Sequence, residues 1–480
     1  MSKQKLRPYQ EQSVAKIQAA WLKHRRVLFV LHMGAGKTVV AARLASTLAE
    51  AGLRVLFVAH RRELVVQAIR KLVLEGVPIQ HLGMIMANPP PEAKDLCGRT
   101  EAPIQVASIQ TFLSRHVEED ARLPFDVIIV DEAQRTASDS YRNMLEMYPK
   151  AKTLGLTGTP WRTDGRGLGE DYDELVVGEE ISRLIQNGYL DRPRVLSWPL
   201  TKLPDLGKLH LVDGDYNGRQ LGAVMSDSVL VGNIVEHWMS HARGRRTVAF
   251  AADVAHSKSI VSRFKEAGVN AWHLDAHTSP KERDRLLNLL REGRIDVISN
   301  CDILSLGWDC PELQCVILAR PTLSRALFMQ QGCRCMRPFI DENAPPGLAR
   351  LPPVILDHSG NAIRHGLPDH VRSYDLRLDR PKGPSMDFAK ECPSCGEVVE
   401  SGVQVCPNCS FVFPPVSRSP GERDGLLAEV IRIPDSTVRA ELKRLAEFAT
   451  RFGYKRPWVC SVMRAKYGER GFVMAADELT

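Results

Sequence analysis

Short apolar runs alternate with helix-like segments along the first third of the chain. The runs are rich in β-branched residues and lack a polar alternation, so they predict strands buried on both faces of a parallel sheet. The predicted strands are VLFVL (27–31), RVLFVAH (54–60), IQVASIQ (104–110), FDVIIVDE (125–132) and AKTLGLTG (151–158). Helical patterns cover 38–52 and 61–76, and Gly52 and Gly76 stand where a glycine would end each helix.

The same alternation returns near Arg246. Predicted strands then lie at 246–252, 270–276, 294–300, 313–320 and 352–358. A helix over 279–293 has a clear start, because Ser279 can cap it, Pro280 takes its first position and Glu282 can complete a capping box. The pattern predicts an α/β fold with two parallel-sheet domains, residues 1–165 and 231–380, joined by a less regular segment, residues 166–230.

The composition of the sequence changes after residue 380. DRPKGPSMDF is typical of a linker, a cysteine-rich patch follows, and the Pro/Ser/Arg stretch FPPVSRSPGERDG precedes a helical segment within residues 420–480. In that last segment Tyr454, Trp458 and Tyr467 are interleaved with lysines and arginines. Such a pattern suits stacking on single-stranded nucleic acid, and it equally suits a small helical domain with a solvated basic face.

Composition narrows the class of protein. The chain has 480 residues, 44% of them hydrophobic and 25% charged, which fits a globular protein of two or three domains. No apolar run approaches the roughly 20 residues of a membrane span, and the first residues carry no signal-peptide pattern, so we expect a cytosolic protein. A net charge of +7 permits a polyanionic partner without requiring one. The 11 cysteines should then be mostly reduced, so clustered cysteines indicate metal.

The stretch HMGAGKT follows a predicted strand and opens a predicted helix, which is the context of a phosphate-binding loop. Leu31 stands where the usual pattern has its first glycine, so the alternative is an ordinary glycine turn. In the nucleotide-binding interpretation the loop holds phosphate through backbone N–H groups, Lys37 reaches the terminal phosphates and the Thr38 hydroxyl binds Mg²⁺. The candidate ATP-binding residues are Gly34, Ala35, Gly36, Lys37 and Thr38.

A second part of the same site is predicted at the end of FDVIIVDEAQ. Asp131 leaves an apolar strand where a Mg²⁺ carboxylate is expected, and Glu132 beside it can polarise an attacking water. Alone, such a pair is often only a polar strand end. Together with the phosphate loop it indicates a site that hydrolyses ATP or GTP.

Four cysteines form two close pairs, Cys392-x₂-Cys395 and Cys406-x₂-Cys409, with ten residues between the pairs. This spacing matches a small zinc ribbon, which we place at residues 388–412. Four thiolate ligands leave no open position, so the predicted Zn²⁺ is structural. Four unrelated free thiols are the alternative.

These motifs, in this order, resemble those of the superfamily 2 helicases and translocases over roughly residues 5–370. LRPYQ resembles the adenine-reading segment, which implies a base contact from Gln10 with Arg7 near it. DEAQ stands where relatives carry DEAD or DEAH, which implies that Gln134 couples the ATP site to LTGTP, with Thr157 and Thr159.

The same resemblance covers the remaining motifs. VAHRRELVVQ and ASIQTF resemble motifs that face the nucleic-acid backbone, and the residues implied are Arg61, Ser108, Gln110 and Thr111. SNCDILSLGWDCPE resembles motif V, with Gly307 and Asp309 at its Gly-x-Asp. The tail arrangement resembles helicases of phages and prophages, so a host cytoplasm is implied if a phage encodes the protein.

The stretch FMQQGCRCMRP resembles motif VI, Q-x-x-G-R-x-x-R, with Cys333 in place of its glycine. Gln330, Arg334 and Arg337 then form one stripe of a helix, and the two arginines approach the γ-phosphate from the second domain. Cys333 and Cys335 point to different sides of that helix, so packing is favoured over metal binding.

The resemblance implies two tandem RecA-like domains that couple ATP hydrolysis, with Mg²⁺, to movement along or unwinding of nucleic acid. LTGTP resembles the DNA-acting relatives, so DNA is favoured over RNA. Replication or recombination proteins are possible partners. The competing hypotheses are a different P-loop NTPase and an ATP-gated nucleic-acid clamp that does not move.

Overall fold

The structure is a computed structural model of the 480-residue chain. It describes residues 5–97, 101–115, 123–136, 138–161, 167–198, 203–212, 214–226, 228–304, 308, 310–340, 352–370, 372 and 374–376, and then 389–391, 394, 398–400, 404–405, 410–413, 428–429, 435–452, 459–460 and 463.

The chain folds into two compact units. Unit 1 consists of the chain up to Leu184 and of a later segment that begins at Tyr374. Unit 2 begins at Ile185. The predicted connecting segment, residues 166–230, contributes a strand to each unit: β7 (Glu174–Val177) lies in the sheet of unit 1 and β8 (Arg194–Ser197) in that of unit 2. Each unit is described below by itself.

Unit 1 is built on a seven-stranded parallel sheet in the order β3-β4-β2-β5-β6-β1-β7. Apart from β7, its strands are β1 (Arg26–Val30), β2 (Val55–Ala59), β3 (Leu82–Ile85), β4 (Ile104–Ser108), β5 (Val127–Asp131) and β6 (Lys152–Thr157). All residues of β2, β4 and β5 are buried, as the continuous apolar runs predicted.

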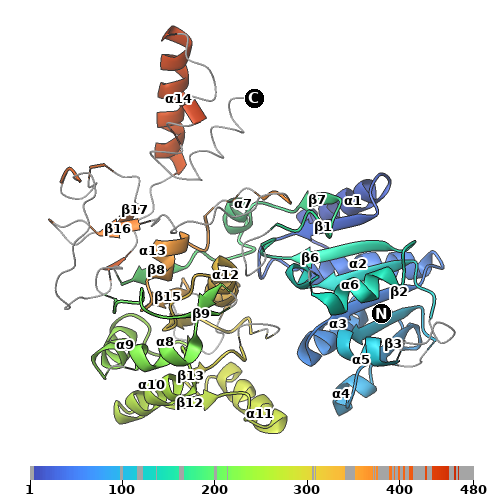
Figure 1. Ribbon diagram of the computed structural model, residues 1–480, viewed down its shortest axis with the longest axis horizontal. Helices are drawn as coiled ribbons and strands as arrows, with labels where there is room; N and C mark the ends of the chain where they lie inside the picture. Colours follow the sequence, from blue (N-terminus) through green and yellow to red (C-terminus); the bar gives the residue numbers. More distant parts are fainter. Residues whose placement is uncertain are drawn as a thin grey trace. The chain divides into compact units, whose positions relative to one another are not determined.

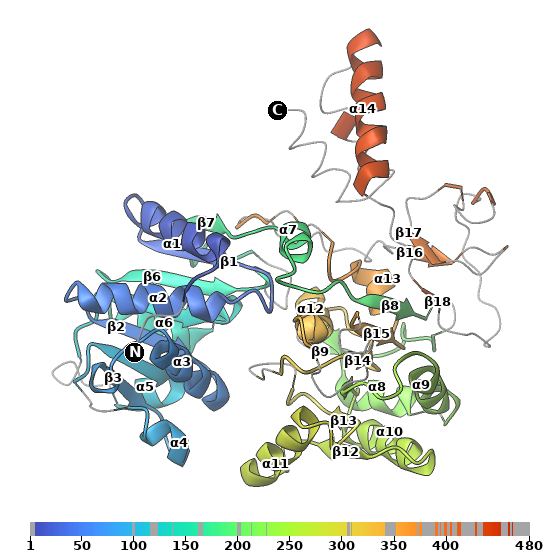
Figure 2. The same cartoon turned by 180° about the vertical axis from the view of Figure 1, so that it is seen from behind.

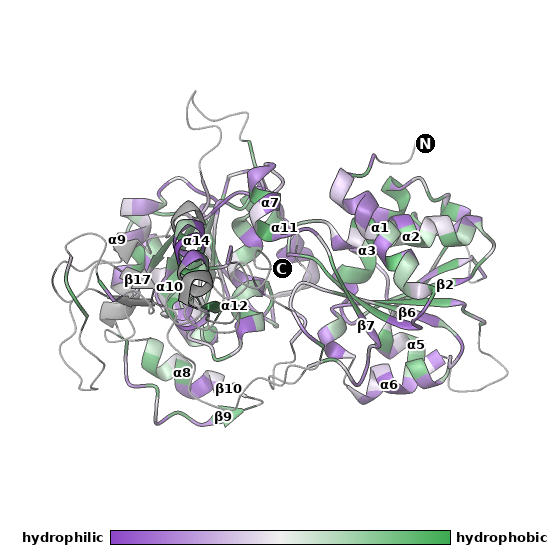
Figure 3. Ribbon diagram, turned by 90° about the horizontal axis from the view of Figure 1, so that it is seen from above, coloured by the Kyte–Doolittle hydropathy of each residue, from purple (hydrophilic) through white to green (hydrophobic). Residues whose placement is uncertain are grey.

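Helices cover both faces of this sheet. Figure 3 shows α1 (Pro8–Trp21), α2 (Lys37–Glu50) and α3 (Arg62–Leu74) on one side, and α5 (Ile109–Arg115) and α6 (Asp139–Glu146) on the other, with mainly hydrophobic (green) strands between them. The core under α5 and α6 takes alternate strand residues, such as Leu56 and Val58 of β2. The short α4 (Pro91–Lys94) and the turns η1 (Ile79–His81) and η3 (Ala133–Arg135) complete unit 1.

The segment that returns to unit 1, Tyr374–Leu376, packs close to the end of β6. The Tyr374 ring lies 5.5 Å from that of Trp161, centroid to centroid, and the Leu376 carbonyl accepts a 2.8 Å hydrogen bond from the Gly169 amide. Tyr374 and Leu376 also cover a buried cluster of Leu28, Val30, Ala133, Leu168 and Tyr172. Unit 1 therefore completes its core with residues far along the chain.

Unit 2 has a second seven-stranded sheet, in the order β12-β13-β11-β14-β15-β8-β18 (Figures 1 and 2). The strands that join β8 are β11 (Thr247–Phe250), β12 (Ala271–Leu274), β13 (Val297–Asn300), β14 (Cys315–Leu318), β15 (Val354–Asp357) and β18 (Ala428–Glu429). All pairings are parallel except that of β18 with β8.

The helices and short elements of unit 2 follow the predicted alternation. The helices are α8 (Gly218–Met225), α9 (Ser228–His241), α10 (Val254–Glu266), α11 (Pro280–Arg291), α12 (Arg325–Gly332) and α13 (Asn361–His365), with α7 (Ile181–Gln186) at the boundary between the units. A small antiparallel hairpin, β9 (Leu211–Val212) and β10 (Asp215–Tyr216), precedes α8. Farther on lie β16 (Ala389–Glu391), β17 (Val398–Glu400) and α14 (Asp435–Phe452).

The predicted α/β fold with two parallel sheets is confirmed. Gly52 and Gly76 have φ of +83° and +81°, as expected for glycines that end helices. Ser279 accepts a hydrogen bond from the Glu282 amide, but the Glu282 carboxylate pairs with Arg285 instead of completing the capping box. None of the helices described is long and apolar enough to cross a membrane.

Candidate active site

The loop between β1 and α2 has the backbone of a phosphate cradle. Gly34 and Gly36 adopt φ of +80° and +91°, in the left-handed region that favours glycine. A Cβ on Gly36 would lie 2.6 Å from Gln10 Nε2, so only glycine fits. Leu31 is buried and its amide donates to the Thr157 carbonyl at 3.1 Å. Leu31 thus continues the strand pairing of β1, which is why this position does not need a glycine.

Two side chains at the start of α1 reach this loop. The Tyr9 hydroxyl donates to the Ala35 carbonyl at 2.7 Å, and Gln10 Nε2 lies 3.3 Å from the same oxygen. Gln10 Oε1 accepts from the Arg7 amide at 3.0 Å, which fixes the glutamine at the beginning of the helix. The sequence predicted a role for Gln10 and Arg7 but not for Tyr9. The position of Tyr9 next to Gln10 was the only indication in the sequence.

Asp131 and Glu132 lie at the carboxyl end of β5. Glu132 has φ of +54°, a rare conformation for a residue with a side chain, and its amide donates to Asp131 Oδ1 at 3.0 Å. Burial and the neighbouring Glu132 carboxylate raise the pKa of Asp131 to about 7, against the opposing effect of the Lys37 ammonium. Two adjacent carboxylates, one of them fully buried, are a donor set that a divalent cation stabilises. The carboxylate pair at the end of β5 therefore fits a bound Mg²⁺.

A chain of hydrogen bonds joins β5 to the end of β6. Gln134 Nε2 donates to Glu132 Oε2 at 2.6 Å, and the Thr157 hydroxyl lies 2.8 Å from Gln134 Oε1. The Thr159 amide donates to the Thr157 hydroxyl at 3.0 Å. A Cβ on Gly158 would lie 3.1 Å from Lys37 Nζ, so this turn also packs against the phosphate loop. A displacement of the LTGTP turn would therefore also displace the side chains of Glu132 and Lys37.

The candidate nucleic-acid residues lie at the carboxyl ends of β2 and β4, which are neighbouring strands. Ser108 and Thr111 are buried and share a 2.9 Å hydrogen bond, and Thr111 also accepts from the Ala87 amide. The two hydroxyls are therefore engaged within the fold, and Gln110 is the exposed member of ASIQTF. Arg61, half-buried, precedes α3 at the end of β2.

His60 was not anticipated as part of this edge of the sheet. Both of its ring nitrogens are buried and have no hydrogen-bond partner. Burial, together with the charges of Arg135 and Arg61, lowers the pKa of His60 to about 3. His60, the residue that follows β2, is therefore a neutral ring.

In unit 2 the arginine segment departs from the predicted continuous helix. The α-helix α12 ends at Gly332, and a 3₁₀ turn covers Cys333–Cys335. Glycine is a poor helix former, and a tighter final turn is a common helix ending. Gln330 therefore lies on α12, whereas Arg334 lies in the turn and Arg337 beyond it.

Arg334 makes two hydrogen bonds within unit 2, and Arg337 is largely buried there. Arg334 Nε donates to the Gln330 carbonyl at 3.1 Å, and its Nη1 contacts the Trp308 carbonyl. Burial lowers the pKa of Arg337 to about 10. Cys333 and Cys335 are buried, in agreement with a packing role. Among the residues described, no group of three or more His, Cys, Asp and Glu side chains could hold a metal ion.

Some predicted site residues lie outside the described residues. They are Gly307 and Asp309 of motif V, and Cys392, Cys395, Cys406 and Cys409 of the predicted zinc ribbon. The polar stretch after β15 is described, and its side chains form hydrogen bonds within unit 2. The Asp357 carboxylate accepts from Ser197 Oγ, Ser359 Oγ and the Ala362 amide at 2.6–2.7 Å.

Comparison with known proteins identifies the family. Residues 3–162 match the family model "Type III restriction enzyme, res subunit", and residues 230–338 match "Helicase conserved C-terminal domain". A 51.5 kDa protein of a Lactococcus phage is 30% identical over 437 residues, which is 90% of this chain and 87% of that protein. The chain belongs to the superfamily 2 ATP-dependent helicases and translocases.

Other relatives of this superfamily 2 protein are longer than it is. A Schizosaccharomyces pombe protein named as a mitochondrial ATP-dependent helicase, irc3, is 30% identical over 398 residues, 76% of this chain and 64% of that protein. The Type ISP restriction-modification enzyme LlaBIII has a similar fold, with a TM-score of 0.55 and 18% identity over 74% of this chain and 28% of that one. The two sheets are thus those of tandem RecA-like domains.

Proposed function

We propose that this superfamily 2 protein is a DNA translocase or helicase that couples ATP hydrolysis in unit 1 to movement along a strand. The observation that carries the proposal is the chain of hydrogen bonds from Glu132 through Gln134 to Thr157, beside Lys37. It joins a carboxylate suited to polarising water to the turn that packs on the phosphate loop. A site that only bound nucleotide would not require that connection.

Each residue of unit 1 has a distinct role in this proposal. Gln10 and Arg7 contact the adenine base, the backbone of 34–38 and Lys37 hold the phosphates, and Thr38 and Asp131 hold Mg²⁺, which would screen the phosphate charge. Glu132 orients the attacking water, and Gln134 holds Glu132 in place. The left-handed backbone at Glu132 is a strained conformation of the kind that is retained at functional sites.

Arg334 and Arg337 of unit 2 supply positive charge to the γ-phosphate in this proposal, with Gln330 beside them. Arg334 contacts the Gln330 and Trp308 carbonyls, and burial lowers the pKa of Arg337, so the first guanidinium is fixed by hydrogen bonds and the second lies in a low-dielectric setting. Charge held in this way acts strongly when it meets a phosphate. The motif V residues Gly307 and Asp309 are proposed to contact the nucleotide from the same unit.

We favour DNA as the nucleic acid. LTGTP resembles the DNA-acting members of the superfamily, and the LlaBIII structure with a similar fold is of an enzyme bound to DNA. Arg61 and Gln110 are the surface residues of unit 1 proposed to contact its backbone, while Ser108 and Thr111 shape the turn that presents them. A structural zinc ribbon at Cys392, Cys395, Cys406 and Cys409 is proposed as an accessory element.

The test is hydrolysis stimulated by nucleic acid in arginine variants. We expect Arg334→Ala and Arg337→Ala each to lower kcat by about 10³-fold or more, as loss of a phosphate-contacting arginine does in related reactions. ATP affinity should change far less, and Arg→Lys should restore little because lysine lacks the planar fork. Cys333→Ala and Cys335→Ala are matched controls in the same turn and should retain activity.

Two outcomes would overturn parts of the proposal. If the arginine variants keep the kcat of the parent, these arginines of unit 2 take no part in ATP hydrolysis. Normal ATP hydrolysis, with neither displacement of a triplex-forming strand nor unwinding of a duplex, would favour an ATP-gated clamp. Comparing single-stranded DNA, duplex DNA, forks and RNA as stimulators identifies the nucleic acid.

A further inference from the structure

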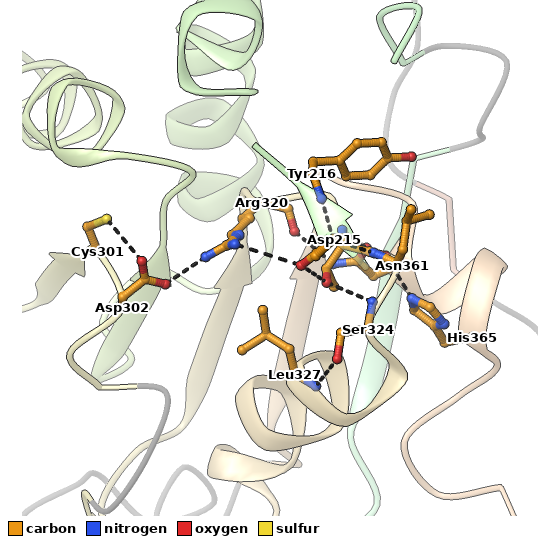
Figure 4. A network of polar contacts seen from close by, with 11 residues as sticks. Asp215, Tyr216, Cys301, Asp302, Arg320, Ser324, Leu327, Asn361 and His365 are labelled. Carbon is orange, nitrogen blue, oxygen red and sulfur yellow. Dashed lines mark hydrogen bonds and ion pairs between the residues drawn. The ribbon is translucent and has the colours of Figure 1, made fainter. Parts of the chain in front are cut away.

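The loop between β14 and α12, residues 320–324, is held by more polar contacts than a connecting loop needs. Figure 4 shows this loop with the hairpin strand β10 and with α13 around it. Asn361 of α13 accepts from the Thr322 amide at 3.0 Å and donates to the Arg320 carbonyl at 2.9 Å. His365 Nε2 lies 2.8 Å from the Thr322 carbonyl. One side of the loop is thus fixed by α13.

The other side of the loop is fixed by Asp215 of the hairpin. Its Oδ2 accepts from the Thr322 hydroxyl at 2.6 Å, and its Oδ1 accepts from the Leu323 amide at 2.8 Å. The same carboxylate lies 3.7 Å from Arg320 Nη2. Asp215 and Arg320 are only 15% and 12% exposed in their side chains, so water competes little for these contacts.

The contacts continue into the first turn of α12. The Ser324 amide donates to the Thr322 hydroxyl at 3.0 Å, and the Ser324 hydroxyl accepts from the Leu327 amide at 3.3 Å as the N-cap of the helix. From this cap the short α12 leads directly to the turn that carries Arg334. The direction of α12 is therefore set at Thr322.

Arg320 also reaches the end of β13. Its Nη1 donates to Asp302 Oδ1 at 2.6 Å, and Asp302 has φ of +58°. Because the Asp302 side chain is 66% exposed, this ion pair contributes little by itself. Asp302 is the nearer of the two carboxylate partners of Arg320, whereas Asp215 is the less exposed one and also holds the loop backbone.

We infer that Asp215 is a positioning residue for ATP hydrolysis, acting through Thr322 and α12 on Arg334 and Arg337. This inference rests on the proposed role of those two arginines. The hairpin β9–β10, which lies between β8 and β11 in sequence, then helps to position the arginines of the active site. A shift of about 1 Å in a charge that must meet a phosphate costs of order 10² in rate.

The experiment compares variants of Asp215 and Thr322 in the full chain. Asp215→Asn and Asp215→Ala should lower kcat for DNA-stimulated hydrolysis by ~10- to 100-fold. The equilibrium affinity for a fluorescent ATP analogue should stay within about 2-fold, because the residues proposed to hold the adenine, the phosphates and Mg²⁺ before hydrolysis, residues 7–38 and Asp131, lie in unit 1. Asp205→Asn is the matched control, since this exposed aspartate of the same segment accepts only from the nearby Gly207 amide in the contacts described.

Thr322 gives a second and independent pair. Thr322→Val keeps the shape but removes the hydroxyl that links Asp215 to Ser324, so it should reproduce the loss of kcat. Thr322→Ser keeps the hydroxyl and should retain most of the activity. If Asp215→Ala does not fold, this pair decides the question.

The outcomes separate this inference from the proposed function. Loss of kcat in Arg334→Ala, together with unchanged kcat in both Asp215→Asn and Thr322→Val, would overturn the positioning role alone. Unchanged kcat in Arg334→Ala would instead overturn the role of the arginines. Equal losses in Thr322→Ser and Thr322→Val would show that the hydroxyl link is not what matters, and would also overturn the inference.

Discussion

Replacing Gln134 tests whether Glu132 needs an oriented partner. In Gln134→Ala the 2.6 Å bond to Glu132 Oε2 is lost, and so is one of the two acceptors near the Thr157 hydroxyl, which keeps the Thr159 carbonyl at 2.9 Å. Hydrogen bonds to charged groups contribute ~1.5–3 kcal/mol. Since each ~1.4 kcal/mol corresponds to tenfold in rate, the full range is about 10- to 150-fold in kcat. Both side chains are half-buried, so we expect the lower part, about 10- to 30-fold.

Isosteric variants make this prediction sharper. Gln134→Glu keeps the shape but places a carboxylate against Glu132, so it should be more harmful than Gln134→Ala. Thr157→Val removes only the other end of the chain of hydrogen bonds. Gln134 and Thr157 belong to one hydrogen-bond network. The increase in activation free energy in the double variant Gln134→Ala with Thr157→Val should therefore be smaller than the sum of the two single increases, by ~0.5 kcal/mol or more.

The assay is steady-state hydrolysis with saturating DNA, paired with equilibrium binding of a fluorescent ATP analogue. ATP affinity should stay within about 2-fold, because Gln134 is not among the groups proposed to hold the nucleotide. Gln186→Ala, at an exposed glutamine of α7, is the control. If kcat of Gln134→Ala stays within 2-fold of the parent, or if the two losses simply add, the coupling argued from these distances is wrong.

Three further predictions concern the same site and the tail. Lys37→Ala should weaken ATP binding, whereas Glu132→Gln should bind ATP and barely hydrolyse it; equal turnover in Glu132→Gln and the parent would exclude the glutamate as catalyst. Because the pKa of Asp131 is about 7 and Mg²⁺ binds the ionised carboxylate, the Mg²⁺ requirement should rise as the pH falls below about 7. An unchanged Mg²⁺ midpoint between about pH 6 and 8, corrected for protonation of ATP, would contradict this. One Zn²⁺ per chain should be found by metal analysis and be lost in a Cys392→Ser/Cys395→Ser variant; zinc-free protein purified under reducing conditions would rule it out.

The strands and motifs that are local in sequence were predictable. Each apolar run predicted a strand within a few residues, because a strand buried on both faces leaves a continuous apolar signature. β3, β7 and β8 were not predicted. β3 carries Gly83, and the Cβ of any other residue there would collide with the buried Gln105 side chain. β7, on the edge of its sheet, begins with half-buried residues and lacks that signature.

Contacts between distant parts of the chain were not predictable. Asp215 and Thr322 are 107 positions apart, and the hydrophobic pattern of the sequence does not indicate which loop a hairpin will contact. The end of α12 at Gly332 was missed because the i, i+4, i+7 spacing of Gln330, Arg334 and Arg337 suits a continuous helix. The burial of Ser108 and Thr111 was missed because short polar residues give no sign of which hydroxyls are satisfied within the fold.

The segment Tyr374–Leu376, which packs on unit 1 after the chain has formed most of unit 2, bears on how the protein can be dissected. A recombinant fragment that stops at Leu184 would expose the apolar side chains that this segment covers, including Leu168 and Tyr172. Such a fragment should be prone to aggregation, and adding the segment through a flexible linker should improve its solubility. During synthesis on the ribosome, unit 1 likewise cannot complete its core until most of unit 2 has emerged.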